Sequence, residues 1–364
     1  MALHRLSRLI LPRALYQQLR RRYFAVLRKV LRVSVARDVR RIIIFLTPGT
    51  NHPSGGVLSI ASLATESRQL VKLHHAEVIW CTLPGDPSLL KYRWFENRLF
   101  LHDADTILRR CTALESLMLH IPEYAVDRVA TWLQSHRSKI EQIKHRHLNV
   151  LLQNIDQIEG QNISTLRTFG EVTCTTAHEA YSNVSIRQRL GIPLHRMSVY
   201  ISPEQYRRTA YEEKDHLLIY SPDGHPRKEE VLSHIANHNP ELQLREIRGL
   251  SYEKFKDLIR RAKWSLTFGE GLDGYFAEPI FSGSVSFAVF NKRFFTPEFA
   301  QLPTVCESWD DLIQRMPQDL TKYDNAMDYN RLWAAAYDRL TALYDIKRYR
   351  DNLRQFYLGN YTFP

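Results

Sequence analysis

The sequence predicts an α/β protein with two parallel-sheet domains that face each other across a cleft. Two series of short apolar runs alternate with helical patterns, as expected of parallel strands connected by helices. A polar segment at 204–215 separates the two series, and 364 residues, 44% of them hydrophobic, suffice for two cores. We therefore expect domains at 41–205 and 215–325, with a basic segment at 1–40 before them and a helical segment at 326–364 after them.

The first series begins with a strand, a glycine loop and a helix. The apolar run Arg41–Leu46 leads into a loop that ends at Gly56, and a helical pattern covers 57–73. Gly55 and Gly56 stand at the turn from strand to helix, where a backbone without side chains can approach a ligand closely. We predict that both glycines line a ligand site. Further strands are expected at 78–82, 116–120, 150–153 and 171–175, and the sheet is expected to end near 199–203.

The second series contains the most informative stretch of the chain. Its strand at 264–268 leads into the loop Gly269–Gly274, and Glu270 and Glu278 lie eight residues apart around that loop. Pro279 suits the first position of a helix, which would place Glu278 near the N-cap. Free backbone N–H groups at such a helix start favour an anion such as a diphosphate, and a carboxylate there can accept hydrogen bonds from ribose hydroxyls. The other elements expected here are strands at 216–220 and 242–247 and helices at 228–236 and 252–262.

This stretch resembles the E-x7-E region of retaining glycosyltransferases of the GT-B fold, especially the large bacterial family that builds surface polysaccharides. The order of the family motif is kept by Glu270, Glu278, Gly283 and the apolar run Val285–Phe290. The resemblance implies two facing Rossmann-like domains, with Glu270 at the donor sugar and Glu278 at the nucleotide ribose. A chance pair of glutamates is the alternative, since 24% of the residues are charged. The resemblance also implies donor binding by the loop residues Gly271, Leu272, Asp273 and Gly274. It places the loop of Gly55 and Gly56 against the donor diphosphate or, as the alternative, against the acceptor.

Basic side chains follow the first strand of the second series. Arg227 and Lys228 lie where a helix is expected to begin, and cations there can neutralise a leaving diphosphate. Members of the family often carry a Gly-Arg pair directly after this strand and a Lys several residues later. Ser221 and Pro222 stand in place of that pair, so the resemblance implies catalytic roles for Lys228 and, as a substitute, Arg227, with Ser221 at the donor. The alternative is two solvated cations in the first turn of a helix.

Polar side chains at strand ends of the first series would complete the donor site. The family tends to place a His after a first-domain strand beside the donor sugar, and this chain has Gln153 and Asn154 there. Amides bind sugar hydroxyls but do not act as general acids or bases at neutral pH. His120 and His178 also follow expected strands and could face the cleft. For both histidines a surface or helix-capping role is the alternative.

No metal or cofactor is expected, and a nucleotide-diphosphate sugar would be bound as substrate. The stretch His102–Asp105 contains a D-x-D pattern, which is the manganese site of the other main glycosyltransferase fold. It precedes a helical pattern at 106–114 instead of ending a strand, which favours a solvated helix start. Zinc-binding spacing, a P-loop and a nucleophile elbow are also missing from the sequence.

All of the excess positive charge lies in the N-terminal arm. Residues 1–41 contain twelve Arg or Lys and one Asp, whereas the rest of the chain has 38 basic and 38 acidic residues. Apolar residues between Tyr16 and Val30 recur at helical spacing, which predicts a basic amphipathic helix. We interpret residues 1–40 as a contact with an anionic membrane surface and expect no nucleic-acid partner. A helix packed on the protein body, nucleic-acid binding and mitochondrial targeting are the alternatives.

A cytoplasmic location, peripheral to the inner face of the membrane, is expected. No apolar run approaches the ~20 residues that cross a bilayer, and Leu9–Leu11 is too short for the core of a secretion signal. The cysteines lack metal-type spacing and are expected to be buried thiols in a reducing compartment. They are Cys81, Cys111, Cys174 and Cys306.

These features predict a metal-independent retaining glycosyltransferase that transfers a sugar from a nucleotide-diphosphate sugar to a saccharide or lipid-linked saccharide in cell-surface polysaccharide synthesis. A non-catalytic protein that keeps the two-domain shell and binds nucleotide is the main alternative. An epimerase or phosphorylase on the same fold is a further one. Sugar transfer would exclude the first alternative, and consumption of the donor without any acceptor would indicate an epimerase.

Overall fold

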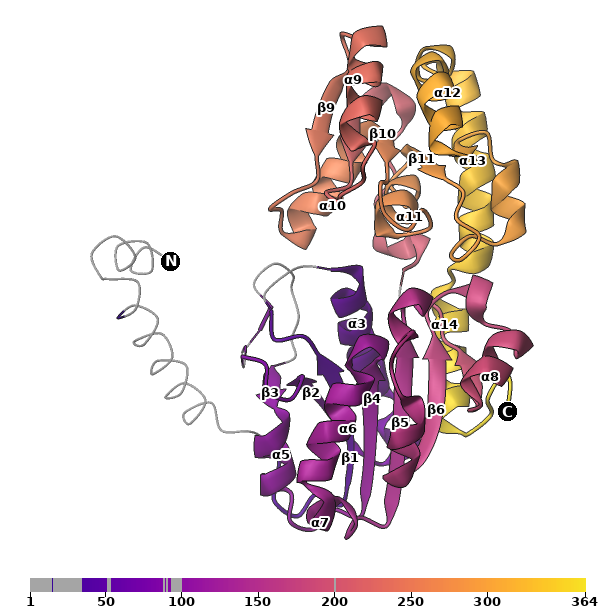
Figure 1. Ribbon diagram of the computed structural model, residues 1–364. Helices are drawn as coiled ribbons and strands as arrows, with labels where there is room; N and C mark the ends of the chain where they lie inside the picture. Colours follow the sequence, from indigo (N-terminus) through magenta and orange to yellow (C-terminus); the bar gives the residue numbers. More distant parts are fainter. Residues whose placement is uncertain are drawn as a thin grey trace.

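The structure, a computed structural model, describes residue 15 and residues 35–50, 54–87, 89, 91–92, 100–199 and 201–364. The helix expected between Tyr16 and Val30 lies outside the described residues. The chain folds into two domains, each built on a parallel sheet, and they lie one above the other in Figure 1. The predicted class, two facing α/β domains, is confirmed.

The first domain contains a seven-stranded parallel sheet with the strand order β3-β2-β1-β4-β5-β6-β7. The interior strand β1 is buried on both faces, with Ile42 and Ile44 packed into one core and Ile43 and Phe45 into the other. Burial on both faces explains why it reads as a continuous apolar run. The strands are β1 (Arg41–Thr47), β2 (Glu77–Thr82), β3 (Leu101–Asp103), β4 (Ser116–Pro122), β5 (His145–Leu152), β6 (Glu171–Thr176) and β7 (Leu194–Arg196).

Helices cover both faces of this sheet. The core around Ile42 and Ile44 includes Ile107 and Val129 from the helices on one face, and the core around Phe45 includes Ile60 from the first helix on the other. The helices are α3 (Gly55–Gln69), α4 (Val71–His74), α5 (Ala104–Arg110), α6 (Val126–Ser135), α7 (Arg137–Ile140) and α8 (Val184–Leu190).

The second domain contains a five-stranded parallel sheet with the strand order β12-β11-β10-β8-β9. Its strands are β8 (Asp215–Tyr220), β9 (Gln243–Glu246), β10 (Ala262–Leu266), β11 (Val285–Val289) and β12 (Val305–Cys306). Its helices are α9 (Lys228–His238), α10 (Tyr252–Arg261), α11 (Gly274–Phe281) and α12 (Trp309–Lys322). The predicted strands and helices of this series are confirmed with shifts of at most two residues at their ends, apart from the start of α11.

Both sheets have a point where the strand order reverses, between β1 and β4 in the first domain and between β8 and β10 in the second. Open parallel sheets bind ligands outside the carboxyl ends of the strands at such a point. The loops that follow β1, β4, β8 and β10 are therefore the places where the fold itself favours a site.

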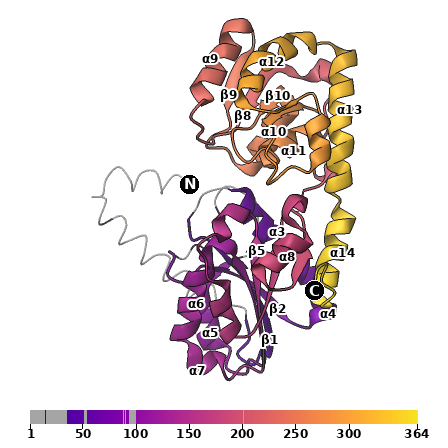
Figure 2. The ribbon, with the colours of Figure 1, turned by 45° about the vertical axis from the view of Figure 1, so that its right-hand side comes forward.

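Two C-terminal helices connect the domains along one side of the molecule, where they run nearly in line (Figure 2). α13 (Ala326–Leu343) packs on the second domain, where Trp333 Nε1 donates to the Ile280 carbonyl at 2.8 Å. α14 (Ile346–Tyr357) packs on the first domain, where the hydroxyls of Tyr357 and Ser67 lie 2.7 Å apart. The helical tail expected from the sequence is split because Asp345 caps α14.

Two smaller expectations have different outcomes. The first sheet ends with β7 and not near 199–203, because the positive φ of Ser198 (64°) takes the backbone out of strand conformation. The four cysteines are buried and unpaired, as predicted. Within the described residues, no helix has the length and apolarity that crossing a bilayer requires.

Candidate functional site

The loop between β10 and α11 carries the two predicted glutamates. α11 begins at Gly274 because the carboxylate of Asp273 accepts the Phe276 N–H at 3.0 Å and caps the helix. The expectation that a helix begins at Pro279, with Glu278 near its N-cap, is wrong. Pro279 lies inside α11, where a proline gives up one intrahelical hydrogen bond, and Glu278 lies in the second turn.

Glu278 is held by two tyrosines in the interior of the second domain. Its side chain is 7% exposed, and its Oε2 accepts hydrogen bonds from the hydroxyls of Tyr206 at 2.8 Å and Tyr252 at 3.0 Å. Burial raises the pKa of Glu278 to about 7, although the two hydroxyls act in the opposite direction. A Cβ built on Gly274 would lie 2.7 Å from Oε1, so this oxygen rests against the first turn of its own helix.

Glu270 lies at the tip of the same loop and is half-buried. Its Oε1 accepts a hydrogen bond from Asn154 Nδ2 at 2.8 Å. Burial and the nearby Asp273 raise the pKa of Glu270 to about 7. Burial likewise raises the pKa of Asp273 to about 7, although the Thr267 hydroxyl donates to it at 2.6 Å. At neutral pH the loop therefore carries less negative charge than its sequence suggests, which lessens the repulsion of an anionic ligand.

Gly271 and Leu272, which were also predicted to bind the donor, determine the conformation and packing of the loop. Gly271 has a φ of 92°, and a Cβ there would meet the Phe295 ring at 2.6 Å. Leu272 is buried in the core of the second domain. The positive φ by itself is enough to require glycine at position 271, whether or not this residue binds a ligand.

The residues predicted on the first-domain side meet at the carboxyl ends of β1 and β5. Gln153 Nε2 donates to the Gly56 carbonyl at 3.0 Å, and a Cβ on Gly56 would lie 2.7 Å from Gln153 Oε1. Gly56 thus makes room for Gln153. Gly55 is the first residue of α3, and a Cβ there would meet nothing within 4 Å. Asn154 follows Gln153 and faces the second domain.

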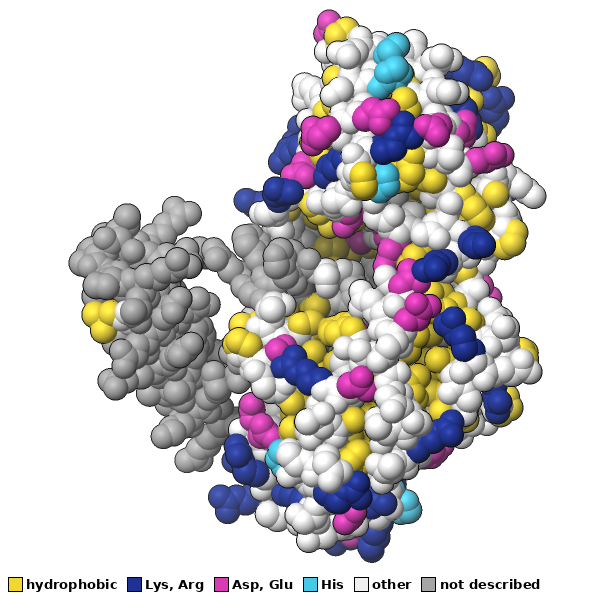
Figure 3. Space-filling model, in the orientation of Figure 1, with side chains coloured by type: hydrophobic (Ala, Val, Ile, Leu, Met, Phe, Trp, Pro, Cys, Tyr) yellow, Lys and Arg dark blue, Asp and Glu magenta, His cyan; other side chains and the backbone are white. Residues whose placement is uncertain are grey.

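Asn154 and Asp156 contact the second domain directly. Asn154 donates to Glu270, and the carboxylate of Asp156 pairs with Arg293, which follows β11. Figure 3 shows a hollow between the two domains, with acidic side chains at its edge. The two predicted faces of the site are therefore brought together across this hollow.

The two predicted histidines have different positions. His120 lies inside β4 and not after it, fully buried and stacked on Phe45 with 4.1 Å between the ring centroids. The expectation that it follows the strand and faces the cleft is wrong, because β4 continues to Pro122. His178 follows β6 and packs edge-on against Phe294 of the second domain, with 5.3 Å between the ring centroids. Burial lowers the pKa of His178 to about 4, so its ring is neutral at pH 7.

Lys228 and Ser221 hold the loop that follows β8. Lys228 Nζ donates to the carbonyls of Ser221 at 3.0 Å and Asp223 at 3.1 Å, and to Glu246 at 3.0 Å. Ser221 Oγ accepts the Phe268 N–H at 2.9 Å, which ties the ends of β8 and β10 together. Lys228 therefore lies beside the switch point of the sheet, and a phosphate there would have to replace one of its present partners.

Arg227 lies at the surface. Its guanidinium pairs with Glu230 and with Asp310 of α12. The hydrogen bond to Glu230 raises the pKa of Arg227 most, and the hydrogen bond to Asp310 adds to this effect. To bind a diphosphate, Arg227 would have to leave both carboxylates.

The D-x-D pattern ends a strand, contrary to expectation. Asp103 is the last residue of β3 and caps α5 by accepting the Thr106 N–H at 2.8 Å. Asp105 accepts a hydrogen bond from Trp132 Nε1 at 2.7 Å. β3 is a three-residue edge strand formed by pairing with β2, which short apolar patterns do not predict. In the described part of the chain, no group of three or more His, Cys, Asp or Glu side chains could hold a metal.

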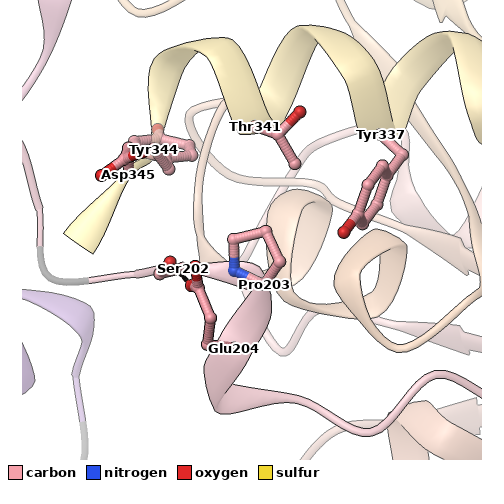
Figure 4. Close-up of a pocket in the computed structure, with 7 residues that line it drawn as sticks. All are labelled: Ser202, Pro203, Glu204, Tyr337, Thr341, Tyr344 and Asp345. Atoms are coloured by element: carbon pink, nitrogen blue, oxygen red, sulfur yellow. Dashed lines mark hydrogen bonds between the residues drawn. The ribbon is translucent and has the colours of Figure 1, made fainter. Parts of the chain in front are cut away.

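A separate cavity of about 370 Å³ lies where the chain crosses between the domains. Its lining contains none of the predicted site residues. Figure 4 shows that it is lined by residues from the segment that follows the first domain, from the C-terminal half of α13 and from the junction of α13 with α14. They are Ser202, Pro203, Glu204, Tyr337, Thr341, Tyr344 and Asp345.

Several site residues were not predicted. Tyr206 belongs to the polar segment that was read only as a domain boundary, and Tyr252 begins α10. Glu123 follows β4 and accepts the Asn154 backbone N–H at 2.9 Å. A carboxylate directly after an apolar run was the available signal for Glu123. Neither tyrosine has a local signal, because both depend on packing around Glu278.

No family model matches the chain, and no curated protein matches its sequence. Solved structures match its fold. Alr3699/HepE from Anabaena in complex with UDP-glucose aligns with a TM-score of 0.57 at 9% identity, over 87% of this chain and 99% of that one. Sucrose-phosphate synthase from Thermosynechococcus elongatus aligns at 0.55 and 9% identity, over 88% and 99%. An α,α-trehalose-phosphate synthase (UDP-forming) from Burkholderia vietnamiensis aligns at 0.52 and 10% identity, over 88% and 98%. The predicted GT-B fold is confirmed.

Proposed function

We propose that the protein is a metal-independent retaining glycosyltransferase that uses a nucleotide-diphosphate sugar. The observation that carries the proposal is the placement of Glu270 and Glu278 around a capped helix start, at the switch point of the second sheet, with Asn154 of the first domain bonded to Glu270. The fold is shared with structures solved with UDP and glucose and with UDP-glucose, which supports a UDP-sugar as donor.

The proposed roles follow from the position of each group. Glu278 accepts hydrogen bonds from the ribose, and the N–H groups at the start of α11 bind the diphosphate together with Lys228. Glu270 and Asn154 flank the sugar as it gains positive character. Arg227 assists only if it exchanges its carboxylate partners for the diphosphate. Preorganised groups of this kind lower the barrier by stabilising charge that develops in the transition state.

Retention of configuration is proposed to proceed on one face of the sugar, with the departing phosphate taking the acceptor proton. The acceptor is a saccharide or lipid-linked saccharide of cell-surface polysaccharide synthesis. Residues 1–40 would hold the protein at an anionic membrane surface through their excess of Arg and Lys. In this proposal the protein acts in the cytoplasm, at the inner face of the membrane.

A non-catalytic nucleotide-binding protein is the second candidate function. The cations favour it, because Arg227 pairs with two carboxylates and Lys228 donates to three oxygens of its own domain. A protein of this kind would bind nucleotide without transferring or hydrolysing the donor.

Thermal-shift measurements with UDP, GDP, CMP and dTDP, and with their sugars, test the site. We expect one nucleotide to raise the unfolding temperature, and Glu278→Ala to abolish that shift. The exposed Glu253 of the same domain provides the matched control, since Glu253→Ala should keep the shift. Hydrolysis or transfer of the matching donor then separates the enzyme from the non-catalytic protein. A shift that survives in Glu278→Ala would contradict the site.

A further inference from the structure

Glu123 is a buried carboxyl at the switch point of the first sheet, and no role above uses it. It is 1% exposed and is the first residue of the turn η1 (Glu123–Ala125) that follows β4. Its Oε1 accepts the Asn154 N–H, while its Oε2 has no hydrogen-bond partner in the described part of the protein. Burial raises the pKa of Glu123 to about 7, although the backbone N–H groups of Asn154, Glu123 and Gln153 act in the opposite direction, so the carboxyl is held by backbone groups of the loop after β5.

Asn154 has each of its polar groups directed to a different partner. Its N–H donates to Glu123, and its Oδ1 accepts the Asp156 N–H at 2.9 Å. Because an N–H group must face Oδ1, the orientation of the amide is set by the first domain alone. Nδ2 is then presented to the second domain, where it donates to Glu270 at 2.8 Å.

We propose that Glu123 is a positioning residue that acts through Asn154. It holds the loop after β5 in place, so that the amide of Asn154 fixes the carboxylate of Glu270 when the domains lie together. Parallel pairing of β4 and β5 places Pro122 opposite Leu151, so Glu123 reaches sideways to this loop. The inference rests on the proposed role of Glu270, and it makes the geometry at the sugar depend on both domains.

Kinetics of Glu123 variants test the proposal. Glu123→Ala should lower kcat by about tenfold to a hundredfold with little change in KM, since a small displacement of a reacting group has effects of that order. Glu123→Gln keeps an oxygen for the Asn154 N–H and should restore most of kcat. The exposed Glu159 of the next turn is the matched control, and Glu159→Ala should behave like the unaltered protein.

The double variant decides whether Glu123 acts through Asn154. If it does, Glu123→Ala combined with Asn154→Ala should be no slower than Asn154→Ala alone. Multiplied effects would show that Glu123 acts by another route and would overturn the proposal. Failure of Glu123→Gln to restore kcat, with the protein still folded, would overturn it as well.

A cross-linking measurement tests the same proposal without any activity. Asp156→Cys and Arg293→Cys place two thiols at the neighbouring contact between the domains, and the four native cysteines are buried. Disulfide formation should become several-fold slower with Glu123→Ala and stay unchanged with Glu123→Gln. Equal rates would overturn the positioning role. Slower cross-linking in a protein that transfers no sugar would support the positioning of the loop and refute the proposed function.

Discussion

Substitution of Gly274 by alanine adds one methyl group beside Glu278 and so tests whether Glu278 belongs to the nucleotide site. Gly274 is the first residue of α11, its φ is not positive, and nothing in the backbone forbids alanine. The added methyl would lie 2.7 Å from Oε1 of Glu278, about 0.7 Å closer than an ordinary contact of ~3.4 Å. Glu278 must therefore move, although Tyr206 and Tyr252 hold its other oxygen.

The expected magnitude comes from two opposing effects. Alanine favours a helix over glycine by up to about 1 kcal/mol. Displacement of Glu278 weakens at least one hydrogen bond to a carboxyl group, and such a bond contributes about 1.5–3 kcal/mol. The second effect is larger, so we expect a net loss of roughly 1 kcal/mol of stability. If Glu278 binds the ribose, a similar loss in binding free energy weakens nucleotide affinity about fivefold.

Calorimetric titration with the nucleotide found in the thermal-shift screen measures the affinity, and chemical denaturation measures the stability. The matched control for stability is Gly55→Ala, at the first residue of α3, where a methyl meets nothing within 4 Å. This control should be as stable as the unaltered protein or more so. Unchanged nucleotide affinity in Gly274→Ala would refute the assignment of Glu278 to the ribose.

Three further predictions concern stability. Lys228→Met should lower the free energy of unfolding by about 1–3 kcal/mol, since hydrogen bonds to Ser221, Asp223 and Glu246 are lost. Arg227→Ala should change it little, because the ion pairs of Arg227 are exposed. Equal losses for the two variants in chemical denaturation would contradict this. Glu278 has a pKa of about 7 in the folded protein, above its ordinary value of 4.5, so the stability it contributes is present below pH 4.5 and declines by up to about 3 kcal/mol as pH rises through 7. Glu278→Gln should flatten that slope in denaturation at a series of pH values. His178 has the opposite effect on the pH dependence of stability. Burial lowers its pKa to about 4, so the stability it contributes is present above pH 6.5 and is lost as pH falls through 4. His178→Leu should remove this loss of stability in acid.

The strands that the sequence predicted well are those buried on both faces. The run 42–46 of β1 is apolar because neither face of the strand meets water, so its pattern can be recognised without knowledge of the partner strand. β3 was missed for the opposite reason, as it is a three-residue edge strand stabilised by pairing with β2. Local pattern thus predicts the centre of a sheet better than its edge.

The start of α11 shows how two local signals compete. Pro279 was read as the first helical residue, whereas the structure caps the helix with Asp273, six residues earlier. The cap prevailed because Asp273 satisfies the Phe276 N–H, while a proline inside a short helix removes a single hydrogen bond. Glu278 consequently faces two tyrosines from the linker and α10, and this arrangement depends on tertiary packing.

The two glutamates differ in which domains hold them in place. Tyr206 and Tyr252 fix Glu278 without any group from the first-domain sheet. Glu270 is bonded to Asn154, so its position depends on how the two domains lie together. In the proposed enzyme the nucleotide would therefore contact groups held by the second domain, whereas alignment of the sugar would also depend on the loop after β5. Contacts to the nucleotide, which lie away from the reacting centre, would then raise the rate only if they also favour the arrangement of the domains in which Asn154 reaches Glu270.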